Sequence, residues 1–222
     1  ALGVLAFSQN YSQHFQKAPY PETKDVVQAM VNQLSLVAYK STIKGLTKFG
    51  DRRQGTARNR AALEWIENKL KNYGYTNTQR HLYEFPSKQV LPRRRQILQP
   101  GFAVGGGRQR GQKGPTSVNR NPNGQKDKRL RKLNTPQSEP GLREQVYCTK
   151  VGTTRPHEMY IVGAHMDGIG WGEAANDDGS GTALVMELAR VFADPTIRTE
   201  CSIRFVLWNN EESGLNGSRA YV

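Results

Sequence analysis

Residues 159–192 read MYIVGAHMDGIGWGEAANDDGSGTALVMELARVF, and the fold follows from this stretch. It opens with a continuous apolar run, 159–164, of the kind found in a buried strand. A Gly-rich loop over 168–181 follows, and then an apolar helix over 182–192, for which Ser180 is the expected N-cap.

The elements on either side of this stretch repeat its strand and helix patterns. The apolar run 203–208 predicts a second buried strand, and residues 146–150 predict another. Residues 24–47 have helical spacing, and a second helix, capped by Thr56, precedes a strand over 78–85. The succession of strand, loop, helix and strand predicts an α/β fold: a three-layer α/β/α sandwich around a mixed, largely parallel sheet.

Length and charge limit the classes of protein to consider. The 222 residues, 36% of them hydrophobic, are enough for one globular domain. The net charge of +13 is typical of nucleic-acid binders, but +12 of it falls within residues 88–132. Phe102 is the one aromatic residue in that window, and single-stranded nucleic acids bind to aromatic platforms, so no specific nucleic-acid partner is expected. No apolar run is long enough for a membrane span, and two cysteines exclude a disulfide scaffold.

Composition divides the chain into four parts. Residues 1–23 are an N-terminal arm or the remnant of a signal peptide, and residues 24–85 form helices and the first strand of the domain. Residues 86–141 are basic and of low complexity, which predicts a disordered insertion or an artefact of the gene sequence. Residues 142–222 form the core that carries the polar clusters, and the missing helix stop signal at their end predicts a C-terminally incomplete domain.

Three polar clusters follow buried elements in the C-terminal part. The first holds His165 and Asp167, the second spans 176–181 at a helix entry, and the third is the pair Glu211 and Glu212. Alone, each is more typical of surface polarity, a helix cap or a solvated helix start. Together they predict a metal site, because sites in such sheets form in loops at the carboxyl ends of strands. A carboxylate can orient a ligating His, and one of two glutamates can handle a proton of water.

These clusters resemble the co-catalytic di-zinc exopeptidases, secreted zinc aminopeptidases related to the glutamate carboxypeptidases. The runs GAHMD (163–167), ANDDGSG (175–181) and FVLWNNEESGLNGS (205–218) carry the resemblance, which is strong over 145–222. The run GDRRQGT (50–56) is similar to the N-terminal helical part of that family, more weakly.

The resemblance implies a role for each residue of the clusters. His165 would bind one zinc ion, Asp177 would bridge two, and Glu212 would bind the second. Glu211 would be the general base, and Asp167 would orient His165. The implied activity is hydrolysis of N-terminal residues from peptides by a metallo-aminopeptidase that holds two Zn²⁺ ions in its complete site.

The resemblance also leaves alternatives. The family pattern has two further ligands downstream of Glu212, an acidic residue and a His, and the sequence ends before them. We therefore expect this chain by itself to be inactive or nearly so. A carboxypeptidase or glutaminyl cyclase of the same fold, and a non-catalytic binding module, stay open, as does the oligomeric state. The resemblance implies a secreted or periplasmic protein, and Cys148 and Cys201 are either paired or free thiols.

Overall fold

The computed structural model describes residues 26–85, 126–133, 138–170 and 172–222. The N-terminal arm and most of the basic insertion expected from the sequence lie outside these residues. The contacts divide the chain into two units, residues 1–34 and 35–222. Helix α1 (Val26–Asn32) is the described element of the first unit, and all other elements belong to the second.

The single helix expected over residues 24–47 is in fact two, α1 and α2 (Leu36–Thr47). Ser35 separates them, because its backbone is extended, with φ −120° and ψ 108°. Its side chain accepts a hydrogen bond from the N–H of Ala38 at 3.1 Å, which caps α2. Apolar spacing alone could not show this break, since the pattern continues through it.

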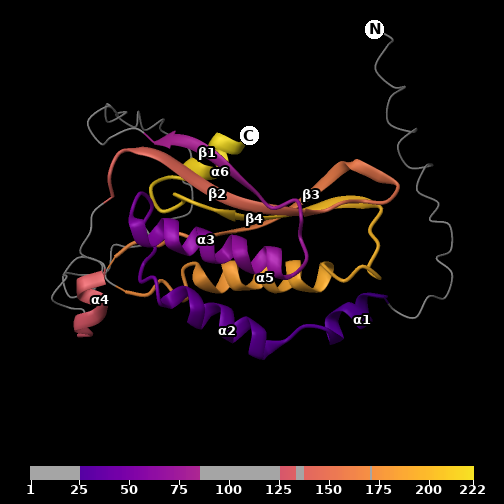
Figure 1. Ribbon diagram of the computed structural model, residues 1–222, viewed down its shortest axis with the longest axis horizontal. Coiled ribbons are helices and arrows are strands. Elements are labelled where there is room, and N and C mark those ends of the chain that lie inside the picture. The colour runs from indigo at the N-terminus through magenta and orange to yellow at the C-terminus, as the bar shows by residue number, and fades with distance from the viewer. Residues whose placement is uncertain (1–25, 86–125, 134–137, 171) are drawn as a thin grey trace, which may run out of the picture. The chain divides into compact units, whose positions relative to one another are not determined.

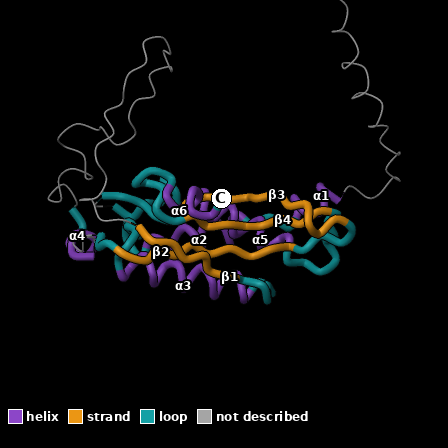
Figure 2. Tube along the Cα trace, turned by 90° about the horizontal axis from the view of Figure 1, so that it is seen from above, coloured by secondary structure: helices purple, strands orange, loops and turns teal. Residues whose placement is uncertain are grey.

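The four described strands form one mixed sheet. Their order is β1 (Gln79–Phe85), β2 (Gly141–Lys150), β4 (Cys201–Trp208) and β3 (Arg155–His165), side by side in Figure 2. β3 and β4 are parallel, and helix α5 (Gly179–Phe192) connects them, whereas β1–β2 and β2–β4 are antiparallel. The expected excess of parallel strands is therefore absent among the described strands.

Helices lie on both faces of this sheet, as expected for an α/β sandwich. Figure 1 shows α2, α3 (Ala57–Asn72) and α5 beneath the sheet and the short helix α6 (Asn216–Tyr221) above it. Successive side chains of β2 point to opposite faces of the sheet, so the strand contributes to the packing on both. Its Cys148 belongs to the core on the side of the large helices, and its Tyr147 contacts Tyr221 of α6 edge to face.

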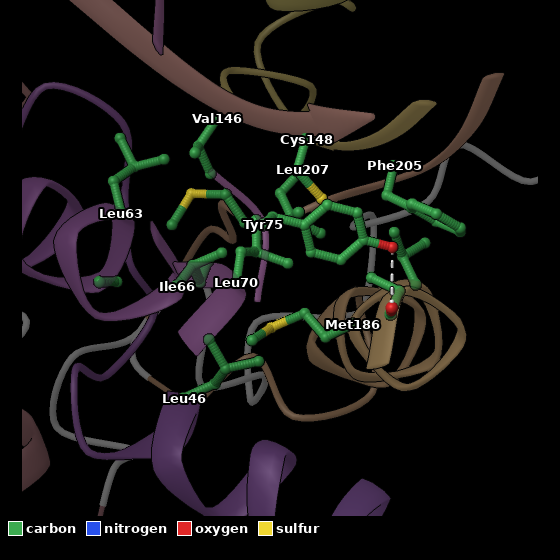
Figure 3. Close-up of a cluster of buried hydrophobic side chains, with 14 residues drawn as sticks. Leu46, Leu63, Ile66, Leu70, Tyr75, Val146, Cys148, Met186, Phe205 and Leu207 are labelled. Carbon is green, nitrogen blue, oxygen red and sulfur yellow. Dashed lines mark hydrogen bonds between the residues drawn. The ribbon is translucent and has the colours of Figure 1, made fainter. Parts of the chain in front are cut away.

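The main core lies between the sheet and the three large helices. Its fully buried side chains include Leu46, Ile66 and Leu70 from the helices and Phe205 from β4. Tyr75 lies among them in Figure 3, and its hydroxyl donates to the carbonyl of Ala189 in α5 at 2.9 Å. This core fixes β4 against α5 and so fixes where both elements end.

Three local expectations are corrected. The run Met159–Ala164 is not buried as predicted: Tyr160 is 67% exposed, because β3 is an edge strand of the described sheet. The N-cap of α5 is Asp178 rather than Ser180; its carboxylate accepts the N–H of Gly181 at 2.8 Å, while the Ser180 hydroxyl donates to a backbone carbonyl. A short helix, α4 (Lys128–Leu133), lies within the segment expected to be disordered.

Two further points concern the described residues. Cys148 and Cys201 are both buried free thiols, which decides between the two alternatives for them. No described helix has the length and apolar character that a membrane crossing requires.

Candidate functional site

The polar clusters meet where the parallel strands β3 and β4 end. His165 is the last residue of β3 and lies opposite Trp208, the last residue of β4. The next backbone amide, that of Met166, donates to the carbonyl of Trp208 at 2.7 Å. The hydroxyl of Thr182 in α5 donates to the carbonyl of His165 at 2.9 Å, which ties the helix start to the same edge.

His165 is at the centre of the site. Its Nδ1 lies 2.9 Å from the backbone carbonyl of Asp167. Its Nε2 lies 3.2 Å from Oδ1 of Asp177, 3.7 Å from Oε2 of Glu211 and 3.9 Å from Oδ2 of Asp178. The structure thus brings together on one imidazole nitrogen carboxylates from the loop before α5 and from the loop after β4.

Asp167 is completely buried, and its backbone carbonyl and its side-chain carboxylate make different contacts. Its carbonyl is the hydrogen-bonding partner of His165, whereas its carboxylate is 3.7 Å from the same ring nitrogen. That carboxylate accepts the backbone N–H of Glu211 at 3.1 Å. Asp167 therefore joins the loop after β3 to the loop after β4 as well as facing His165.

Carboxylates dominate the electrostatics of the site. Burial lowers the pKa of His165, but the hydrogen bond and charge of Asp167, with the charges of Asp178 and Glu211, outweigh it and raise that pKa to about 9. Burial also raises the pKa of Glu212 to about 7, and the charges of Asp177 and Asp167 add to the shift. One imidazole cannot balance this many carboxylates, so the site has an excess of negative charge.

This set of donors fits a zinc ion by type and by charge. Imidazole nitrogen and carboxylate oxygen are ordinary zinc ligands, and a divalent cation offsets the mutual repulsion of the carboxylates. Oδ2 of Asp167 is buried and has no hydrogen-bond partner in the described parts of the chain. Among the described residues, however, no three His, Cys, Asp or Glu side chains are already arranged around one cation position.

A cavity of about 310 Å³ opens beside the cluster. Its lining includes the ionisable side chains of His165, Asp178 and Glu211 and the largely apolar side chains of Trp208 and Leu215. A small molecule or a chain end in this cavity would therefore have the imidazole and the Glu211 carboxylate within reach.

Sequence reasoning missed two residues next to the site. Arg52 is buried, and its guanidinium donates to the carbonyls of Met166 and Ala174 in two of the site loops. Asn59 of α3 is hydrogen-bonded to Asn209, in the third. Arg52 belongs to the polar run 50–56, but the sequence assigned it no role, and nothing in the sequence pattern singled out Asn59.

Comparison with protein families and curated proteins agrees with the geometry. The sequence pattern described as peptidase family M28 matches residues 146–222. A "Probable lipoprotein aminopeptidase LpqL" of Mycobacterium tuberculosis is 35% identical over 113 residues, which are 51% of this chain and 19% of that protein. A "Carboxypeptidase Q" of Xenopus laevis is 35% identical over 71 residues, 32% of this chain and 15% of that protein. The chain thus spans less than a fifth of the length of these relatives.

Solved structures share the fold at low sequence identity. The zinc aminopeptidase BSAP from Bacillus subtilis superposes with a TM-score of 0.54 and 17% identity, over 83% of this chain and 63% of that one. A glutaminyl cyclase from Porphyromonas gingivalis gives 0.53 and 16%, over 86% and 53%. The three polar clusters all lie inside residues 146–222, and this segment of the chain is therefore the part that is similar to peptidase family M28.

Proposed function

We propose that the protein is a zinc-dependent exopeptidase and that it acts as an aminopeptidase. The observation that carries this proposal is the approach of Asp177 and Glu211 to the same nitrogen of His165, from two different loops. Such an assembly of one imidazole and several carboxylates beside a cavity fits metal-assisted hydrolysis better than it fits a solvated surface.

Each residue has a role in this proposal. His165, Asp177 and Glu212 would hold the two zinc ions. When bound, the zinc ions acidify water and polarise the carbonyl of the substrate. Asp167 keeps His165 oriented through its carbonyl, which accepts the Nδ1 proton and leaves Nε2 free to ligate.

Glu211 is the proposed general base. Its side chain is about one third exposed and lines the cavity, so it can reach both water and the substrate. It takes a proton from the attacking water and gives that proton to the leaving amine. The hydrogen bond from its backbone N–H to Asp167 fixes the base relative to the ligand His165.

The relatives support the broad class more strongly than the exact reaction. Similar proteins and structures include an aminopeptidase, a carboxypeptidase and a glutaminyl cyclase. We choose the aminopeptidase because the motifs resemble the secreted zinc aminopeptidases. The same resemblance, and a relative named as a lipoprotein, support a location outside the cytoplasm.

The test compares four substrates, each incubated with the native protein in the presence of zinc. We expect hydrolysis of a leucyl-nitroanilide and none of its N-acetylated form, because an aminopeptidase requires the free amine. Release of a C-terminal residue from a blocked dipeptide would instead indicate a carboxypeptidase, and cyclisation of an N-terminal glutamine a cyclase. Glu211→Gln should lower kcat by roughly 10²–10⁴-fold while zinc content is retained. If Glu211→Gln lost its zinc, or if its kcat were unchanged, the proposed role of Glu211 as general base would be contradicted.

A further inference from the structure

We infer that Arg52 and Asn59 are positioning residues that set the distances between the three loops of the site. This inference rests on the proposed function, because it assigns to these residues the geometry of the proposed zinc site. Both residues lie outside the segment that matches the peptidase family, residues 146–222. The inference therefore extends the site to a part of the chain that the family match does not include.

All three guanidinium nitrogens of Arg52 donate hydrogen bonds to backbone carbonyls. Its Nε donates to Met166 at 2.7 Å, between the two polar residues of the first cluster. Its Nη1 donates to Glu173 at 2.9 Å and its Nη2 to Ala174 at 2.8 Å, both in the loop that leads to Asp177. One planar, rigid group thus fixes the loop of His165 relative to the loop of Asp177.

The same guanidinium is anchored to its own segment. Nη1 also donates to the carbonyls of Gly50 at 3.1 Å and Leu46 at 3.3 Å. Arg52 is fully buried, and burial lowers its pKa to about 10. The negative charges of Asp167, Asp51 and Asp178 raise that pKa but do not outweigh the effect of burial. A charge buried this deeply is costly to place, and its contacts with the site loops offset that cost.

Asn59 connects the third loop. Its side-chain amide exchanges hydrogen bonds with that of Asn209, at 3.1 Å and 2.9 Å, two residues before Glu211. It also donates to the carbonyl of Arg52 at 2.7 Å. The loop after β4 is thereby held to the residue that holds the other two loops.

The backbone gives a second, independent observation. Among the described residues, the non-glycine residues with positive φ are Arg52 (51°), Ala174 (46°), Asn210 (62°) and Leu215 (60°). Arg52 is one of the two proposed positioning residues, and the other three lie in or beside the loops of the site. Residues persist in this unfavourable region where the surrounding contacts over-determine them, and such strain concentrates at functional sites.

The test is amide hydrogen exchange on the metal-free native protein, followed by zinc titration. Arg52→Lys keeps the charge but removes the planar fork, and we expect exchange in residues 165–178 to become about tenfold faster. Asn59→Ala should accelerate exchange over residues 209–212. Both variants should bind zinc about 10–100-fold more weakly in competition with a chelator.

Leu70→Ala is the matched control, because Leu70 is fully buried in the main core. We expect it to lower the urea midpoint and to speed exchange in the core strands, while zinc affinity in the folded protein stays unchanged. If Arg52→Lys does not fold, Asn59→Ala alone decides the question.

Two results would overturn the inference: faster exchange in the core strands of Arg52→Lys or Asn59→Ala with no preference for the site loops, or loop exchange identical to the wild type. Because exchange is measured without zinc, a native wild-type protein that fails to bind zinc would refute the proposed function and not the positioning role.

Discussion

Gly217→Ala is a sensitive test of how α6 supports the loop of Glu211 and Glu212. A Cβ at Gly217 would lie well inside van der Waals contact of the carbonyl of Asn209 and of Oε1 of Gln145. The first of these is backbone, so a rotamer change cannot relieve the clash. α6 and the loop after β4 would have to separate by about 1 Å, and overpacking of this kind costs about 1–3 kcal/mol.

Two hydrogen bonds weaken in the same movement. The Gln145 amide donates to the carbonyl of Gly217 at 3.0 Å, and the Tyr83 hydroxyl donates to the carbonyl of Asn209 at 3.0 Å. Each contributes about 1 kcal/mol when fully formed, and the movement weakens each by about half. Added to the overpacking cost, this should lower the free energy of unfolding by about 2–4 kcal/mol in total. Because Asn209 precedes Glu211 by two residues, a displacement of about 1 Å should also lower turnover of the native protein by about 10²-fold.

The assay is urea denaturation followed by tryptophan fluorescence. Gly172→Ala is the matched control, since nothing lies within 4 Å of its Cβ position. It should change the free energy of unfolding by no more than about 0.5 kcal/mol. If Gly217→Ala were as stable as this control, α6 would not be packed against the loop as described, and the reasoning would be refuted.

Three further predictions test the core, the acid stability and the metal site. Tyr75→Phe removes the hydrogen bond to Ala189 and should lower the free energy of unfolding in urea by about 1 kcal/mol; an unchanged midpoint would contradict the buried bond. Burial raises the pKa of Glu187, but Arg190 outweighs this effect and holds it below the ordinary 4.5, so its stabilising contribution is present above that pH and is lost as pH falls further. Glu187→Gln should therefore flatten the acid limb of stability measured from about pH 3 to 7, and parallel curves would argue against the ion pair. His165→Ala should abolish zinc binding in a chelator competition, and wild-type affinity in that variant would exclude His165 as a ligand.

Much of the fold could be predicted from local patterns. The apolar runs 159–164 and 203–208 predicted two of the strands, because runs of this length and residue type are typical of strands. The break at Ser35 and the cap at Asp178 were missed, because each depends on a backbone conformation that several sequences could adopt. The exposure of β3 was missed because burial of a strand depends on its neighbours in the sheet, and strand order is a tertiary property.

The sequence by itself singled out the candidate residues for the chemistry. His165, Asp167, Asp177, Glu211 and Glu212 stand out by residue type and by position after apolar runs, and these signals are local. Localising the basic charge to residues 88–132 also removed nucleic acid as the expected partner. Only the tertiary structure decided how the loops are held together, since Arg52 and Asn59 are more than 100 residues from the loops that they contact. Contacts at that separation leave no periodic trace in the sequence, because they arise from packing of the helical layer on the sheet.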